Sequence, residues 1–112
     1  MEENNKKPIL RGIKGAPGVT EGRVRKILTP YKEVKFEAGY VAVTEFTTPV
    51  LALSLKEAKA IVCEKGTTTS HAAVISREWG IPCLVSVKEA MTILQDEDFI
   101  IVDADEGVIY KR

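Results

Sequence analysis

The chain has 112 residues, of which 45% are hydrophobic and 29% are charged, and its 16 basic and 16 acidic residues cancel. A chain of this length can build one hydrophobic core but has no room for a second catalytic domain. Neither sign of charge forms a long run, which argues against a nucleic-acid surface or a polybasic membrane patch. No stretch approaches the roughly 20 apolar residues that cross a bilayer, and residues 1–7 lack the apolar centre of a signal peptide, so a cytoplasmic protein is expected.

The predicted elements alternate between strands and helices along one domain. Residues 1–9 are expected to form a flexible polar tail, and residues 10–112 a single domain that opens with a turn-rich approach over residues 12–19. Apolar runs and alternation predict strands over residues 20–28, 40–44, 60–63, 83–87, 99–103 and 108–111, the last two joined by a hairpin turn. Helical spacing predicts helices over residues 50–59, 70–79 and 88–94. The pattern predicts an α/β domain with a curved sheet of about six strands and about three helices.

The single histidine, His71, stands where a hydroxyl-rich loop becomes an apolar helix, in Gly66-Thr67-Thr68-Thr69-Ser70-His71-Ala72-Ala73-Val74-Ile75. An imidazole has an ordinary pKa of about 6.5, so much of it is neutral and nucleophilic near neutral pH. The first turn of a helix has free backbone N–H groups and the positive end of the helix dipole, which stabilise an anion such as a phosphoryl group. Thr69 or Ser70 can act as the N-cap by accepting from a free N–H. The alternative is that His71 is an ordinary polar residue just inside a capped helix.

The segment from Cys63 to Val87 resembles the phosphohistidine swivelling domain, which is the mobile domain of phosphoenolpyruvate-utilising enzymes such as phosphoenolpyruvate synthase, pyruvate phosphate dikinase and enzyme I of the sugar phosphotransferase system. Three positions depart from the family pattern: Thr67 replaces the second glycine before the histidine, Ala16 replaces a serine near the start, and Ser86 or Val87 replaces a glycine after the strand. A β-branched Thr67 is expected to stiffen the loop. The matching residues are Gly66, Thr69, Ser70, His71, Ala72, Ala73, Arg77, Glu78, Gly80, Ile81 and Pro82.

The resemblance implies a swivelling β/β/α fold in which His71 is the catalytic residue and transiently carries a phosphoryl group. It also implies that Gly66, Thr69 and Ser70 surround that group, and that a threonine near a strand-to-helix junction, Thr47 or Thr48, approaches the histidine. Both threonines also fit a simpler role, which is to cap the helix that Pro49 opens.

The resemblance further implies partners that this chain lacks. A nucleotide-binding, ATP-grasp-like protein, a phosphoenolpyruvate-binding barrel protein, or both would exchange the phosphoryl group with His71 in trans, and the acceptor could also be of another type. Mg²⁺ and ATP or phosphoenolpyruvate are expected on those partners, with no cofactor or metal held by this chain. The chain would then be a phosphotransferase component that is inactive without its partners. The alternative is a non-catalytic regulatory or binding module that retains the fold, for which Thr67 is the main support.

Other residues that could carry chemistry have simpler interpretations. Arg77 lies about 240° around the helix from His71, so it is predicted to form a salt bridge or contact a partner rather than hold the phosphoryl group. Trp79 is interpreted as a packing residue, with docking as the alternative. Cys63 and Cys83 lack metal-ligand spacing and are predicted to be buried free thiols. Asp103 and Asp105 are interpreted as solvated turn residues rather than metal ligands.

Overall fold

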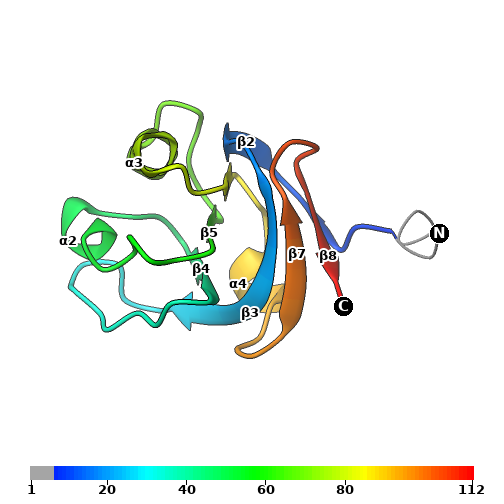
Figure 1. The fold of residues 1–112 in the computed structure, drawn as a ribbon, viewed down its shortest axis with the longest axis horizontal. Helices are drawn as coiled ribbons and strands as arrows, with labels where there is room; N and C mark the ends of the chain where they lie inside the picture. The colour runs from blue at the N-terminus through cyan, green and yellow to red at the C-terminus, as the bar shows by residue number, and fades with distance from the viewer. Residues whose placement is uncertain (1–6) are drawn as a thin grey trace.

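The computed structural model describes residues 7–112 and contains eight strands and three helices (Figure 1). In chain order they are β1 (Leu10–Arg11), β2 (Ile13–Ala16), β3 (Val19–Ile27), β4 (Tyr40–Thr44), α2 (Pro49–Ala52), β5 (Ala60–Cys63), α3 (His71–Trp79), β6 (Cys83–Val85), α4 (Ala90–Ile93), β7 (Phe99–Asp103) and β8 (Val108–Lys111).

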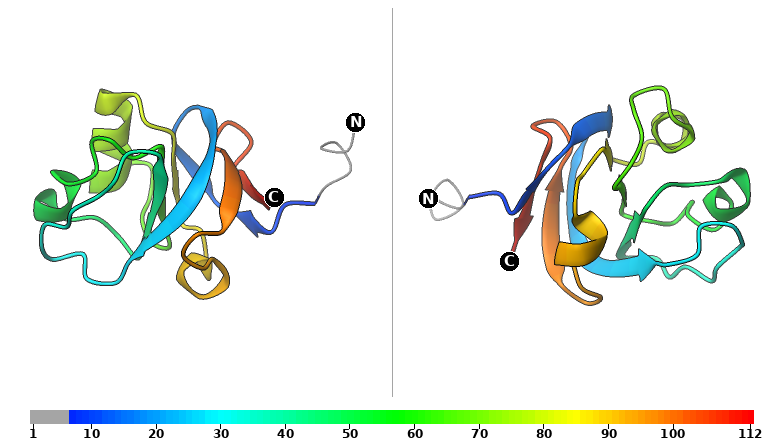
Figure 2. Two further views of the ribbon diagram at one scale, coloured as in Figure 1. Left: turned by 60° about the horizontal axis from the view of Figure 1, so that its bottom comes forward. Right: turned by 180° about the vertical axis from the view of Figure 1, so that it is seen from behind.

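All eight strands belong to one strongly curved sheet with the order β1-β8-β7-β3-β4-β5-β6-β2. Strands β3 to β6 pair in parallel, and the remaining pairs are antiparallel. Strands β1 and β2 lie at opposite edges of this order although only Gly12 separates them in the chain, so the sheet curls until its two edges approach each other (Figures 1 and 2). A Cβ atom at Gly12 would lie 2.5 Å from Cγ2 of Val87, which explains why the closure needs glycine.

The curved sheet is buried on both faces by two separate groups of apolar residues. In β4, Val41 and Val43 pack inside the curl, whereas Ala42 between them packs on the outer face under α2 and α3. This alternation follows from the two-residue period of a strand, and burial on both faces is typical of parallel sheets. Helix α4 lies between the two halves of the curl, and α2 and α3 lie side by side against the other face (Figures 1 and 2). The domain therefore has three layers, of which two are the opposing halves of the curled sheet and the third is formed by helices.

This architecture confirms the predicted α/β class and its swivelling-domain layering. The strands expected over residues 40–44, 60–63, 99–103 and 108–111 have the predicted bounds, and β3 is displaced by one residue. The prediction of a turn-rich approach over residues 12–19 was wrong, because residues 13–16 form the edge strand β2. Together with β1, which was also not predicted, it gives the sheet eight strands rather than six. Of the flexible tail expected over residues 1–9, residues 1–6 lie outside the described range, and the amide of Ile9 donates to the carbonyl of Ile109.

Three other elements are shorter than predicted. The helix expected over residues 50–59 ends at Ala52, and the following residues form tight turns with bonds between residues three apart, such as Leu55 N–H to the Ala52 carbonyl. The strand expected to reach residue 87 ends at Val85, because Ser86 has a φ of 55°, which breaks the extended backbone. The helix expected over residues 88–94 begins at Ala90, because Glu89 has a φ of 68°.

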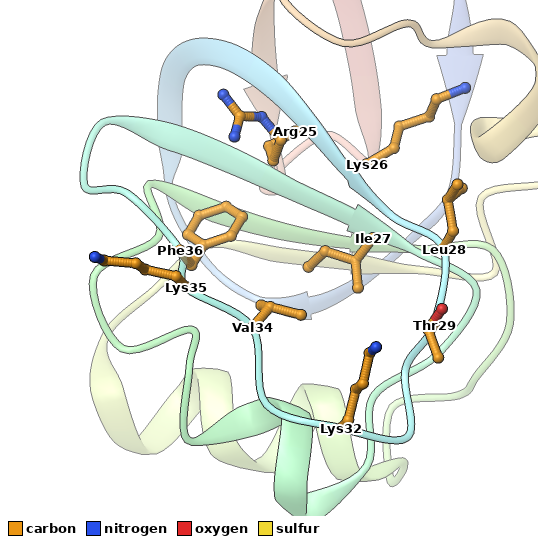
Figure 3. Close-up of a pocket in the computed structure, with 9 residues that line it drawn as sticks. All are labelled: Arg25, Lys26, Ile27, Leu28, Thr29, Lys32, Val34, Lys35 and Phe36. Atoms are coloured by element: carbon orange, nitrogen blue, oxygen red, sulfur yellow. The ribbon is translucent and has the colours of Figure 1, made fainter.

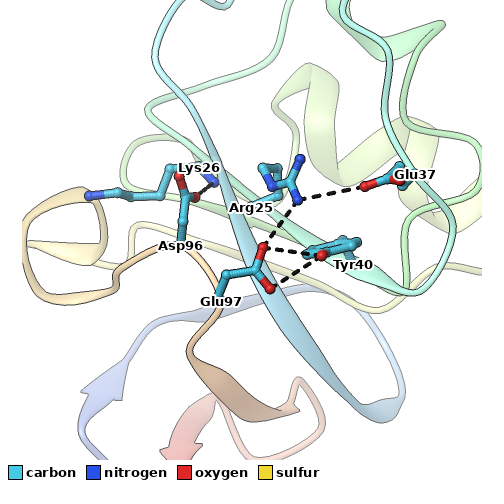
Figure 4. Close-up of polar contacts among 6 residues, drawn as sticks. All are labelled: Arg25, Lys26, Glu37, Tyr40, Asp96 and Glu97. Atoms are coloured by element: carbon cyan, nitrogen blue, oxygen red, sulfur yellow. Dashed lines mark hydrogen bonds and ion pairs between the residues drawn. The ribbon is translucent and has the colours of Figure 1, made fainter.

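One polar cluster joins β3 and β4 to the loop before β7 (Figure 4). The Arg25 guanidinium lies 3.2 Å from a Glu97 carboxylate oxygen and 3.6 Å from one of Glu37, and 4.3 Å above the centre of the Tyr40 ring. The Tyr40 hydroxyl donates to Glu97 at 3.1 Å. These groups are largely exposed, so the cluster orients the loops more than it stabilises the fold.

Candidate functional site

His71 is the first residue of α3 and follows a loop that leaves the buried strand β5. Gly66 begins the reversal of this loop with a φ of 121°, a conformation that side chains rarely adopt. A Cβ atom at this position would also lie 3.0 Å from the Ser70 hydroxyl. The helix then ends at Gly80, which has a left-handed backbone, as predicted. The half-buried His71 is thus held at the open end of a helix that packs on the sheet.

Thr47 is the threonine that reaches the histidine. Its Oγ1 lies 3.0 Å from Nδ1 of His71, and the threonine is 8% exposed. The neighbouring Thr48 is the N-cap of α2, accepting from the Leu51 amide at 3.2 Å and donating to the Pro30 carbonyl at 2.6 Å. The sequence left both threonines open to either role, and the structure assigns the contact with the histidine to Thr47 and the helix cap to Thr48. Because Nδ1 is engaged, Nε2 is the ring nitrogen left for chemistry.

The first turn of α3 has no side-chain cap, which corrects the predicted role of Thr69 or Ser70. Ser70 occupies the N-cap position, but its hydroxyl donates backwards to the Thr67 carbonyl at 2.8 Å. The first helical bond is from Val74 N–H to the Ser70 carbonyl. The N–H groups of the first turn therefore keep the anion-stabilising character that capping would have consumed.

Thr67 does not strain the loop. Of the described residues, its segment contains one positive φ, at Gly66 rather than at position 67. The Thr67 hydroxyl accepts from the Thr69 amide at 3.3 Å and lies 3.1 Å from the Thr69 hydroxyl. Thr67, which stands where the family pattern has its second glycine, therefore takes part in ordering the loop without adopting a positive φ.

Arg77 bonds to the edge strand β2, and within residues 7–112 it forms none of the salt bridges that the sequence analysis allowed. Its guanidinium donates to the carbonyl of Gly15 at 2.7 Å, and no carboxylate of residues 7–112 lies within 4 Å of it. This bond ties α3 to the edge strand β2. Sequence reasoning missed the contact because β2 was not predicted.

Trp79 is partly buried and packs against the outer core, as predicted for a packing residue. The Lys56 ammonium lies 5.6 Å from the centre of its ring.

The remaining candidate residues have structural partners. Cys63 and Cys83 are buried and free, as predicted, and burial raises the pKa of both thiols, that of Cys83 to about 11. Asp105 accepts from the Gly18 amide at 3.0 Å, and Asp103 accepts from the Glu106 amide at 3.0 Å.

Residues 7–112 contain no group of three or more histidine, cysteine or acidic side chains arranged to hold a metal ion. The longest helix in that range has nine residues and is too short to cross a membrane.

Sequence reasoning also missed the support that the β3–β4 loop gives to the site. The Pro30 carbonyl accepts from Thr48, and the Ser54 hydroxyl accepts from the Val34 amide at 2.9 Å. These bonds fix the loop to the N-cap of α2, which follows Thr47 directly, and to the turn after the helix. The sequence contains no local signal for contacts between residues 18 and 20 positions apart.

Comparison with known proteins agrees with this geometry. The family model described as "PEP-utilising enzyme, mobile domain" matches residues 36–107. A probable phosphoenolpyruvate synthase of Archaeoglobus fulgidus is 38% identical over 98% of this chain, and the chain spans 15% of that relative's length. A solved structure of enzyme I has a TM-score of 0.61 and 26% identity over 69% of this chain and 32% of its own.

The fold also occurs in a protein of different name. Aconitase X of Thermococcus kodakaraensis has a TM-score of 0.67 over 92% of this chain and 97% of its own, at 21% identity, and this likeness shows the fold alone. The family match covers β4 to the β7–β8 turn and includes both Thr47 and His71. The chain therefore belongs to the mobile-domain family of phosphoenolpyruvate-utilising enzymes.

Proposed function

We propose that this domain transiently carries a phosphoryl group on Nε2 of His71. The observation that carries the proposal is the 3.0 Å contact between Thr47 Oγ1 and His71 Nδ1, at a helix N-terminus without a side-chain cap. The contact leaves Nε2 as the nucleophile, and the helix end supplies stabilisation for an arriving anion.

The contact is consistent with a reaction that needs no proton transfer at the histidine. When Nδ1 carries the proton and donates it to Thr47 Oγ1, the Nε2 lone pair attacks phosphorus while the bond from phosphorus to the leaving oxygen breaks. The ring becomes a phosphorylated imidazolium that retains its Nδ1 proton. When an acceptor oxygen attacks the same phosphorus, the N–P bond breaks and its electron pair returns to Nε2, restoring neutral imidazole. The productive tautomer is therefore the one in which Nδ1 carries the proton and Thr47 Oγ1 accepts it.

The phosphoryl group itself would be held by the first turn of α3 and the loop before it. The uncapped N–H groups face an incoming anion, and the hydroxyls of Thr69 and Ser70 flank them. Gly66 allows the loop to reverse so that these groups lie beside His71. Thr48 contributes by fixing the start of α2 rather than by touching the phosphoryl group.

The donor and acceptor chemistry would belong to other protein units. The chain spans 15% of the length of its Archaeoglobus relative, whose name includes phosphoenolpyruvate synthase. Partners that fit are a nucleotide-binding, ATP-grasp-like protein and a phosphoenolpyruvate-binding barrel protein, which hold Mg²⁺ with ATP or phosphoenolpyruvate. The mobile domain would contribute the nucleophile and its orientation.

Intact-mass measurement after reaction with phosphoramidate, a small phosphoryl donor, tests the reactivity of His71 without any partner. A single acid-labile phosphoryl adduct is expected, and it should be absent from His71→Ala because the chain has one histidine. Long-range ¹⁵N–¹H spectra should assign the adduct to Nε2. A second reaction uses the Archaeoglobus relative, with the residue that aligns with His71 replaced, and ATP or phosphoenolpyruvate. Absence of an adduct with both donors, or an adduct that persists in His71→Ala, contradicts the proposal.

A further inference from the structure

The loop between β3 and β4 forms a concave surface, separate from the His71 site, whose charged lining residues are all positive. The hollow has a volume of about 220 Å³ and lies between the end of β3 and residues 29–36. Its apolar floor consists of Ile27, Val34 and Phe36, whose side chains face one another (Figure 3). The charged residues that line it are all cationic, although the whole chain has equal numbers of acidic and basic residues.

Most of these cations are not neutralised within the domain. Arg25 is paired with Glu97 and Glu37, but Lys26, Lys32 and Lys35 have no carboxylate oxygen within 4 Å of their ammonium groups among residues 7–112. The Lys26 ammonium donates to the Met91 carbonyl and lies 3.5 Å from the Gln95 amide oxygen, so it is directed away from the apolar floor (Figure 3). The Lys32 ammonium points toward the hollow, and Lys35 projects from its edge (Figure 3).

The position of the hollow links it to the segment that holds His71. Thr48 and Ser54 fix the loop to α2, and Tyr31 of the same loop packs edge-on against Phe46, the residue before Thr47, with ring centres 5.6 Å apart. Tyr31 and Leu28 are 70% and 79% exposed, so the margin of the hollow presents apolar surface to solvent. Exposed aromatic and aliphatic side chains beside a pocket are typical of protein contact sites.

We propose that this hollow is a docking site for an acidic segment of a protein partner that bears an apolar anchor. The anchor side chain would contact Ile27, Val34 and Phe36, and flanking carboxylates would face Lys32 and Lys35. Charge complementarity selects the acidic partner, while the small apolar floor supplies the contact area. Binding is independent of the phosphoryl chemistry at His71, so it can fail or succeed separately from the proposed function.

Titration of the ¹⁵N-labelled domain with short peptides tests the proposal. The probe peptide is Asp-Asp-Leu-Phe-Glu-Asp, and the comparison peptides are Lys-Lys-Leu-Phe-Lys-Lys and Asp-Asp-Ser-Ser-Glu-Asp. We expect saturable shifts at the amides of Ile27, Val34 and Phe36 with the probe only, and unchanged binding in His71→Ala.

Reversing the two loop lysines, in a Lys32→Glu and Lys35→Glu double variant, should weaken probe binding about tenfold. The matched control reverses Lys7 and Lys14, which are exposed on or before the strands at the two sheet edges. An equal loss in the control, equal binding of the basic peptide, or no saturable binding of the probe would overturn the proposal. A normal phosphoramidate adduct on His71 in the loop variant would show that the catalytic site is intact.

Discussion

At the scale of single residues, the site depends on which of two adjacent threonines faces the histidine. Thr47 is buried and contacts Nδ1, whereas Thr48 caps α2 and holds Pro30. Local sequence could not separate these roles, because both residues precede Pro49 and both can cap a helix. The path of the turn after β4 decides which of the two threonines faces His71.

Replacing Thr47 with valine should slow phosphorylation of His71 by phosphoramidate about tenfold, because the ring loses the contact that orients it. The rate of adduct formation by mass spectrometry measures this, and ¹⁵N shifts of His71 should show a changed tautomer ratio. Thr68→Val, at an exposed position in the loop, is the matched control and should react like the unaltered domain. A normal rate and tautomer ratio in Thr47→Val would show that the contact has no role.

Ser86 carries a backbone cost that glycine would relieve. Its φ of 55° lies in the left-handed region, where a side chain costs about 1 kcal/mol. Ser86→Gly should therefore raise the free energy of unfolding in urea by up to about 1 kcal/mol. Thr68→Gly, at a position without positive φ, should instead lower it by about 0.5 kcal/mol. Equal destabilisation by Ser86→Gly and Thr68→Gly would show that the positive φ of Ser86 has no measurable cost in stability.

At the scale of elements, α3 is positioned by a glycine at each end and by one side-chain tether. Gly66 shapes the entry loop, Gly80 ends the helix, and Arg77 binds the Gly15 carbonyl of β2. Gly80 could be identified from the sequence because the chemistry that ends a helix is local, whereas Gly66 was identified only through the resemblance to the family pattern. The tether could not, since it joins residues 62 positions apart.

Gly66→Ala and Gly80→Ala should separate loop shape from helix stability. Each alanine adopts an unfavourable positive φ, so each should cost about 1 kcal/mol of unfolding free energy. At Gly66 the new Cβ also meets Ser70 at 3.0 Å, whereas at Gly80 nothing lies within 4 Å. We therefore expect Gly66→Ala alone to reduce the rate of His71 phosphorylation, measured by intact mass. Equal rates in the two variants would contradict the role of the loop.

At the scale of the whole molecule, the closed curl of the sheet buries two thiols in its outer core layer. Cys63 and Cys83 lie on neighbouring strands β5 and β6, and burial raises the pKa of Cys83 from its ordinary value of 9.0 to about 11 and that of Cys63 further. Between pH 9 and 11 the unfolded chain releases these protons and the folded domain keeps them. Their contribution to stability is therefore complete below pH 9 and is lost as the pH rises toward and above 11.

Urea unfolding at pH 8 and pH 10 should accordingly show a loss of stability at the higher pH. Replacing both cysteines with alanine should lower stability at pH 8 through lost packing but reduce its decline with pH. The difference between the two slopes is the measured quantity, since lysine and tyrosine titration is common to both proteins. Identical slopes would indicate that the thiols are not buried in solution.

The sequence by itself determined the α/β class, the place of the histidine at the start of a helix, the central strands and the chain-closing hairpin. These features depend on apolar periodicity and on glycine and proline, whose effects act over a few residues. Only the tertiary structure decided that residues 10–16 form both sheet edges, that Thr47 rather than Thr48 reaches His71, and that Arg77 binds β2. Each of these depends on the closure of the curved sheet, which brings together residues that are distant in the chain and leave no local signal.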